Sequence, residues 1–191
     1  MMHQLPVSTV RLELVPATLP ILTCDLHHDA AGLGRLLNAT VPASWPPSLL
    51  DDDALAHFVA LLLEGSDPFF CSWYWIRSGV GGADRVLIGS GGIATKEGSD
   101  DTVMIGYSVL EEFQDLGYAT EAVRHLIPAI FSDPAIRRIV ATTYPELKAS
   151  IRVLENCGFL PAGPTGGCTG MEEGTVMMVR ERDTTEMAGL R

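Results

Sequence analysis

A polar stretch with a single glycine follows an apolar run in the middle of the chain. Residues 111–122 read EEFQDLGYATEA and come directly after VMIGYSVL at residues 103–110. If the run is a strand and the stretch opens a helix, the helix start presents unpaired backbone N–H groups and the positive end of the helix dipole. Such an end binds phosphate without a lysine. Gly117 lets the backbone approach a ligand closely, Ala119 is small, and Gln114 carries a side-chain amide donor.

Hydrophobic periodicity predicts the elements that hold this turn. Strands are expected over residues 9–16, 69–79, 85–96, 102–110, 136–144, 159–163 and 174–182, the last two flanking a glycine-rich hairpin. Helices are expected over 51–65 and 148–158, in an interrupted form over 17–40, and after Gly117 as far as Phe131. A proline-rich loop covers 39–48, and 183–191 is expected to be a flexible tail. This order predicts a single α/β domain over residues 1–191 with a mixed sheet.

Composition excludes several classes of protein. The chain of 191 residues is 47% hydrophobic and 19% charged, as globular proteins are, and no apolar run is long enough for a transmembrane helix. Its formal charge of −11 argues against nucleic acid and tolerates a cationic partner. The four cysteines are scattered and form no CxxC pair, which predicts reduced thiols and no metal site. No signal peptide is evident, so a cytoplasmic location is expected. A homodimer stays open.

Two motifs together resemble the GNAT family of N-acetyltransferases. QDLGYA at residues 114–119 matches the pattern Q/R-x-x-G-x-G/A, and TTYPELKASIRVLENCGF at 142–159 is similar to the family's second motif. The resemblance covers roughly residues 85–163 and looks most like the ribosomal-protein-alanine acetyltransferase (RimJ/RimL-like) branch. It implies a mixed, mostly antiparallel sheet that splays between its fourth and fifth strands, with helices on both faces and acetyl-CoA in the gap.

The resemblance also assigns roles to residues. Val109 and Leu110 would pair with the pantetheine arm of acetyl-CoA as an added strand does. The pyrophosphate would be wrapped by Gln114, Asp115, Leu116, Gly117, Tyr118 and Ala119, with Thr120 as a phosphate-binding hydroxyl. Ser150 would hydrogen-bond or protonate the departing thiolate. The implied activity is acetyl-CoA-dependent N-acetylation of a primary amine, at a protein N-terminus or in a small molecule. The amine would attack the thioester directly, with the N–H near Val109 stabilising the oxyanion.

Some positions depart from the family pattern. Leu147 replaces an asparagine that contacts CoA in many relatives, and Leu154 replaces a tyrosine general acid of other branches. Asp115 puts a negative charge in the turn, and Pro128 is expected to kink the following helix. These departures keep a second hypothesis open, a CoA-binding module without catalysis.

The general base and the acceptor amine are not identified by the sequence. The candidate bases are Glu111, Glu112, Tyr144 and Glu146, and a water chain competes with them.

Three other features favour structural roles. The pair His27 and His28 in HHD cannot share one face of a helix, which disfavours a metal site. GSGG at 89–92 lies inside a strand pattern and predicts close backbone packing or a bulge. Trp45 and the run 73–75 could line an acceptor pocket, but the two tryptophans of the run share one strand face and the tyrosine takes the other, so at least one face is expected to be core.

Overall fold

The computed structural model describes residues 6–79, 84–95, 98–164 and 174–183. Its strands are β1 (Val7–Ser8), β2 (Leu12–Pro16), β3 (Ser72–Arg77), β4 (Val86–Thr95), β5 (Thr102–Val109), β6 (Arg138–Thr143), β7 (Leu160–Pro164) and β8 (Val176–Glu181). Its α-helices are α1 (Leu19–Leu26), α2 (Ala30–Leu37), α3 (Asp52–Leu63), α4 (Tyr118–Phe131) and α5 (Lys148–Asn156). Two short 3₁₀ turns are Pro68–Phe70 and Glu111–Phe113.

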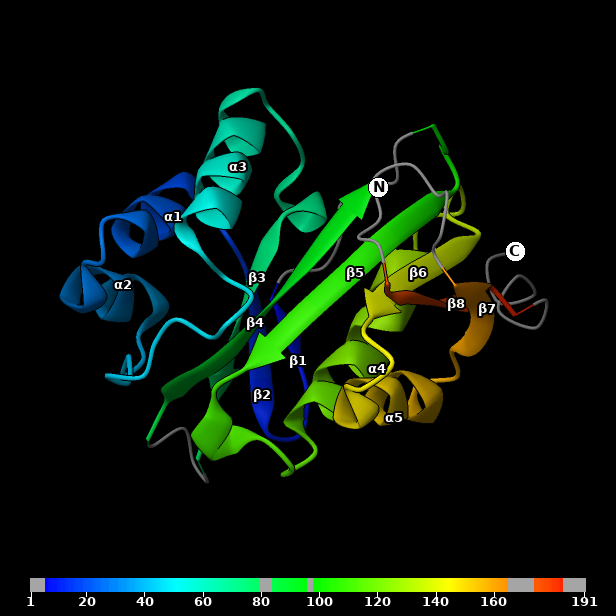
Figure 1. The fold of residues 1–191 in the computed structure, drawn as a ribbon. Helices are drawn as coiled ribbons and strands as arrows, with labels where there is room; N and C mark the ends of the chain where they lie inside the picture. Colours follow the sequence, from blue (N-terminus) through cyan, green and yellow to red (C-terminus); the bar gives the residue numbers. More distant parts are fainter. Residues whose placement is uncertain (1–5, 80–83, 96–97, 165–173, 184–191) are drawn as a thin grey trace.

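All eight described strands form one sheet in the order β1-β2-β3-β4-β5-β6-β8-β7 (Figure 1). Every neighbouring pair is antiparallel except β5 and β6, which are parallel. That parallel pairing joins only residues 102–104 to residues 138–140. Because β5 continues to residue 109 and β6 to residue 143, their C-terminal parts have no partner in each other. The sheet is therefore splayed between these two strands, the fourth and fifth of the strands predicted from the sequence.

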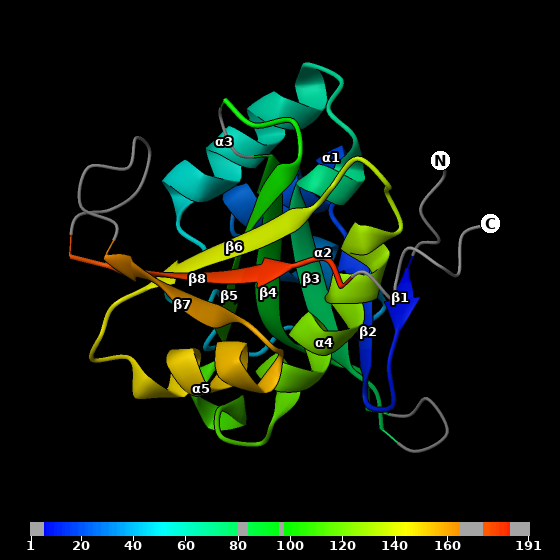
Figure 2. The ribbon, with the colours of Figure 1, turned by 90° about the vertical axis from the view of Figure 1, so that its right-hand side faces the viewer.

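Helices cover both faces of the sheet, as predicted (Figures 1 and 2). Helices α1, α2 and α3 pack on one face, over a core that includes Tyr74, Ile76 and Leu87. Helix α4, with α5 beside it, packs on the other face over a core that includes Trp73 and Trp75. Alternate residues of β5 reach this second core, which is why the run 103–109 reads as a strand with one apolar face.

The structure differs from the sequence-based boundaries near the N-terminus. Residues 9–16 do not form one strand, because the backbone N–H of Thr9 donates to the carbonyl of Leu12 in a tight turn that separates β1 from β2. The interrupted helix predicted over 17–40 is two helices, and Asp29 caps the second by accepting from the N–H of Gly32 at 2.8 Å. Helical spacing predicts one apolar face of α3 from Leu55, Phe58, Val59, Leu62 and Leu63, but Leu63 is 70% exposed and lies outside that face.

Pro128, which is expected to kink helix α4, does not end it, because the helix continues through Pro128 to Phe131. Most of the glycine-rich hairpin and of the C-terminal tail lies outside the described residues. None of the helices in the described part of the chain is long and apolar enough to cross a membrane.

The glycines of GSGG serve close packing inside β4, as predicted. A Cβ on Gly89 would lie 2.6 Å from the carbonyl oxygen of Ser108, and one on Gly91 would lie 2.9 Å from the Trp75 ring. Both distances are shorter than real Cβ contacts, so only glycine lets β4 sit this close to β5 and to Trp75.

Candidate functional site

The turn from β5 to α4 forms the start of the candidate site. It passes through a 3₁₀ turn and then through Asp115 (φ 57°) and Gly117 (φ 80°), both in the left-handed region. The first helical hydrogen bond of α4 runs from the N–H of Glu121 to the carbonyl of Gly117, and Gly117 offers no side-chain cap. The N–H groups of residues 118–120 therefore have no helical acceptor. These N–H groups, at the positive end of α4, can receive an anion.

The side chain of Gln114 stabilises this turn by a hydrogen bond to the backbone. Its side-chain Nε2 donates to the carbonyl of Val109 at 2.9 Å, which ties the end of β5 to the approach to α4. An amide nitrogen carries two hydrogens, so the second remains for another acceptor. The predicted phosphate contact of Gln114 can be made only through that second hydrogen while this bond holds. Asp115 and Leu116 beside it are exposed.

The edge of β5 that faces the splay presents backbone groups of Val109. Val109 lies opposite Gly89, and the N–H of Leu110 donates to the carbonyl of Ile88 at 2.9 Å. In an antiparallel ladder this bond makes the 89–109 pair a non-hydrogen-bonded one, so the N–H of Val109 points away from β4 and toward the gap. The two residues predicted to pair with an added strand thus differ. Val109 has its N–H on the open edge, whereas the N–H of Leu110 is used within the sheet.

Ser150 lies in the first turn of α5, where it meets a tyrosine that the sequence analysis did not single out. The hydroxyl of Tyr107 lies 3.2 Å from the carbonyl oxygen of Ser150 and 3.4 Å from its Oγ. The Tyr107 ring stacks on Trp75 with ring centroids 6.1 Å apart. Burial, partly offset by the Ser150 contact, raises the pKa of Tyr107 to about 12, so the phenol stays protonated at neutral pH. The pair connects β5 to α5 across the splayed region.

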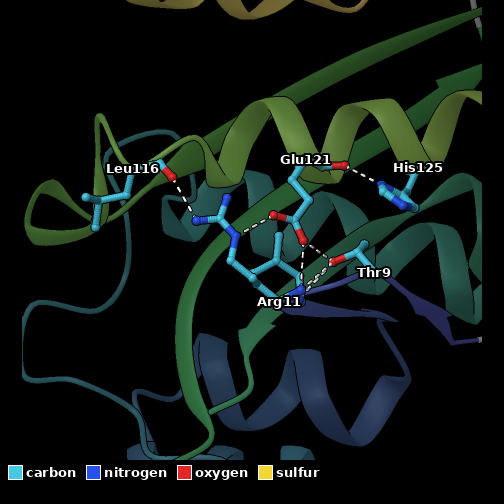
Figure 3. A network of polar contacts seen from close by, with 6 residues as sticks. Thr9, Arg11, Leu116, Glu121 and His125 are labelled. Carbon is cyan, nitrogen blue, oxygen red and sulfur yellow. Dashed lines mark hydrogen bonds and ion pairs between the residues drawn. The ribbon is translucent and has the colours of Figure 1, made fainter. Parts of the chain in front are cut away.

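An arginine from the start of the chain also reaches the turn. Arg11 precedes β2, and its Nη1 donates to the carbonyl of Leu116 at 3.0 Å, while its Nε pairs with Glu121 at 2.6 Å (Figure 3). Burial alone would raise the pKa of Glu121, but hydrogen bonds from Thr9 and Arg11 outweigh it and lower that pKa below its ordinary value. Residues 111–122 contain no Lys, Arg or His, so the local sequence gave no sign that the Arg11 cation reaches this turn.

The aromatic run 73–75 is core on both strand faces, and its three side chains are fully buried. They therefore line no open acceptor pocket. The hydroxyl of Tyr74 donates to Asp25 at 2.7 Å, and Trp45 Nε1 donates to the other oxygen of the same carboxylate at 2.7 Å. Burial raises the pKa of Asp25, although these two donors oppose the shift.

The predicted general bases are mostly exposed. Glu111, Glu112 and Glu146 are exposed, and Tyr144 is half-buried. Glu112 accepts from the Ser44 hydroxyl at 2.5 Å, which lowers the pKa of Glu112 and weakens it as a base. This contact also fixes the proline-rich loop beside the end of β5.

Leu154 is 1% exposed in the core, and Leu147 is 51% exposed. Leu154 therefore occupies its position as a packing residue. His27 and His28 are exposed, and His28 lies 3.6 Å from Asp52. Among the described residues, no group of three or more His, Cys, Asp or Glu side chains could hold a metal ion.

Comparison with known proteins agrees with this architecture. A ribosomal-protein-alanine acetyltransferase from Vibrio fischeri aligns with a TM-score of 0.60 at 17% identity, over 95% of this chain and 98% of the other. RimL, a ribosomal-protein α-N-acetyltransferase solved with coenzyme A, aligns with a TM-score of 0.60 at 20% identity, over 93% and 97%. Mycobacterium smegmatis RimJ, solved with a CoA disulfide, gives 0.55 at 18%, over 89% and 81%.

At these identities the solved structures establish a shared fold. A search of curated protein sequences found no match. The family model of the GNAT acetyltransferase domain matches residues 24–160, well over half of the chain, and includes β5, the turn, α4 and α5. The chain belongs to the GNAT acetyltransferase family.

Proposed function

We propose that this protein is an acetyl-CoA-dependent N-acetyltransferase that transfers an acetyl group to a primary amine by direct attack, with residues 1–191 as one catalytic domain. One observation carries the proposal. The helix-start N–H groups of α4 directly follow an exposed turn, residues 114–117, that continues from the open edge of β5. An anion site and a free strand edge, joined in this way, suit a ligand with a diphosphate at one end and an amide-containing arm at the other.

The turn and the strand edge would divide the binding of acetyl-CoA between them. The N–H groups of Tyr118, Ala119 and Thr120 suit the diphosphate. The Thr120 side chain offers a hydroxyl as a further donor to the same group. The Val109 N–H faces the gap, where it suits an oxygen that gains negative charge. When bound, acetyl-CoA supplies an acetyl group already activated as a thioester.

Ser150 and Tyr107 supply the proton donors at the other side of the gap. With its pKa raised to about 12, Tyr107 keeps its proton and can donate to Ser150. Ser150 is then free to direct its own O–H to a departing thiolate. This arrangement offers a replacement for the tyrosine acid that Leu154 does not provide.

Proton removal from the amine is assigned to water. The carboxylates near the ends of β5 and β6 are exposed, where water is at hand to take the proton, and the hydrogen bond from Ser44 lowers the pKa of Glu112 and weakens it as a base. Catalysis would then depend mainly on positioning the amine against the thioester.

The acceptor is proposed to be an amine of cationic character, in the cytoplasm. The formal charge of −11 favours a positively charged partner over an anionic one. Two of the similar structures are named as ribosomal-protein acetyltransferases, which supports a protein N-terminus as one acceptor to test, alongside small amines.

A non-catalytic CoA-binding module is the second candidate, because Leu154 and Leu147 replace side chains that other relatives use. Calorimetric titration with CoA tests what the two candidates share. Release of free thiol from acetyl-CoA, screened over a library of peptides and small amines, separates them. CoA binding without thiol release for any amine would favour the binding module, and absence of CoA binding would exclude both.

A further inference from the structure

The guanidinium of Arg11 joins two parts of the turn that precedes α4. Its Nε pairs with Glu121 Oε2 at 2.6 Å, and its Nη1 donates to the carbonyl oxygen of Leu116 at 3.0 Å (Figure 3). The same group lies over the Tyr118 ring, 4.4 Å from its centroid. Sequence separates Arg11 from these contacts by more than 100 residues, so the fold alone brings them together.

Glu121 holds this guanidinium in place because its own carboxylate is fixed. Oε1 accepts from the Thr9 hydroxyl at 2.5 Å and from the backbone N–H of Arg11 at 2.8 Å. The carboxylate side chain is only 12% exposed. Glu121 therefore fixes the Nε side of the Arg11 guanidinium, and the Nη1 group on its other side contacts Leu116.

The direction of the Leu116 carbonyl fixes the direction of the next N–H. A trans peptide unit is planar, with its C=O and N–H pointing in opposite directions. The Leu116 oxygen points to Arg11 (Figure 3). The N–H of Gly117 belongs to the same peptide unit and therefore points away from Arg11. We propose that Arg11 is a positioning residue of the cofactor site, which holds the 116–117 peptide so that the Gly117 N–H joins the helix-start donors that receive the diphosphate.

Charge at the helix start adds to this role. Glu121 lies in the first turn of α4, where an uncompensated carboxylate would oppose the binding of a polyanion. Arg11 offsets that charge on the side of the turn away from the Gly117 N–H. The inference rests on the proposed function, since it assigns Arg11 to the same CoA site.

Replacing Arg11 by lysine tests the two-armed hydrogen bonding of the guanidinium separately from its positive charge. Lysine keeps the positive charge but has a single ammonium, which cannot reach Glu121 and Leu116 in the planar geometry of a guanidinium. We expect Arg11→Lys to weaken CoA binding about 10- to 100-fold, the range for one hydrogen bond to a charged group. Binding of pantetheine, the arm of CoA without the diphosphate, should stay as in the wild type. The amide resonance of Gly117 should shift without ligand, which gives a readout independent of affinity.

A second arginine provides a matched control. Arg85 makes a comparable fork, with Nη1 on Glu13 at 2.6 Å and Nε on the carbonyl of Asn38 at 2.7 Å, at the C-terminal end of α2. Arg85→Lys should leave the affinity for CoA and the Gly117 resonance unchanged.

Several results would overturn the assignment. These are wild-type CoA affinity in Arg11→Lys, an equal loss of CoA and pantetheine binding, and an unmoved Gly117 resonance. If the wild-type protein itself failed to bind CoA, the proposed function would fall, and this assignment with it.

Discussion

Replacing Ser150 by alanine tests the catalytic half of the proposal. The substitution deletes one hydroxyl that lies 3.4 Å from the Tyr107 hydroxyl, in the first turn of α5. A serine at a helix start can also serve as a cap, in which case its loss costs about 1 kcal/mol of stability. The N-cap of α5, however, is Leu147, and no side chain caps the helix there.

The two roles differ in the size of their effects. The 3.4 Å contact is long for an O–H···O bond, so its loss should cost no more than about 0.5 kcal/mol of unfolding free energy. In a chain of this size that lowers the melting temperature by about 2 °C or less. A hydrogen bond to a developing thiolate involves a charged group and is worth about 1.5–3 kcal/mol, which corresponds to a roughly 10- to 100-fold fall in kcat.

The assay compares kcat, the Kd for CoA and the melting temperature in three variants. Ser150→Ala should lower kcat as stated and leave the Kd nearly unchanged. Tyr107→Phe should lower kcat less, because Ser150 remains. Ser132→Ala removes a hydroxyl that donates to Ala129 at 2.7 Å at the end of α4, and should leave kcat as in the wild type. A lowered melting temperature with wild-type kcat in Ser150→Ala would make Ser150 structural and refute this reasoning.

Three further predictions concern the turn and its surroundings. Gly117→Val should weaken CoA binding, since it adds a side chain to the turn at φ 80°. The control Gly65→Val adds the same backbone strain at φ 87° in open space and should leave CoA binding unchanged. Equal CoA affinity of the two variants by calorimetry would contradict the placement of the diphosphate at Gly117. Asp115→Asn should change CoA affinity little, even at low salt, because Asp115 is exposed, and a several-fold gain would show that its charge faces the phosphates. Because the pKa of Glu121 is lowered in the fold, its ionised form stabilises the protein above the ordinary glutamate pKa of about 4.3, and this stabilisation is lost as the pH falls through the lowered pKa. Glu121→Gln should therefore flatten the decline of the melting temperature at acid pH. A decline parallel to that of the wild type would contradict this prediction.

Local signals were sufficient to predict the strand, the turn and the helix of the candidate site. The apolar run and the glycine correspond to β5 and to a residue at φ 80°, and α4 begins at the next residue. A glycine in that conformation and an apolar periodicity are properties of a few neighbouring residues. The splay came from the resemblance of two motifs, because a break in strand pairing leaves no trace in the periodicity of either strand.

Long-range contacts explain what the sequence did not reveal. Alternation along β5 could place Tyr107 on the inner face of the strand, but its partner Ser150 lies 43 residues further along the chain. Arg11 meets Glu121 across 110 residues. Neither pair has a spacing that a helix or a strand imposes, so each depends on how the elements pack. The boundary error at residues 9–11 has a related cause, because Thr9 forms the turn there and also holds Glu121.

The acidity of the turn becomes intelligible once these contacts are known. Residues 111–122 carry four carboxylates, an unexpected composition for a stretch proposed to bind a diphosphate. Two of the four are engaged elsewhere, Glu121 by Arg11 and Thr9, and Glu112 by Ser44. The other two, Glu111 and Asp115, are exposed, where water screens their charge. The anion would therefore meet backbone N–H groups with little opposing charge. The affinity of the turn for the anion should depend on how rigidly the turn is held. The Arg11 guanidinium, from a distant part of the chain, contributes to that rigidity by binding Leu116 and Glu121.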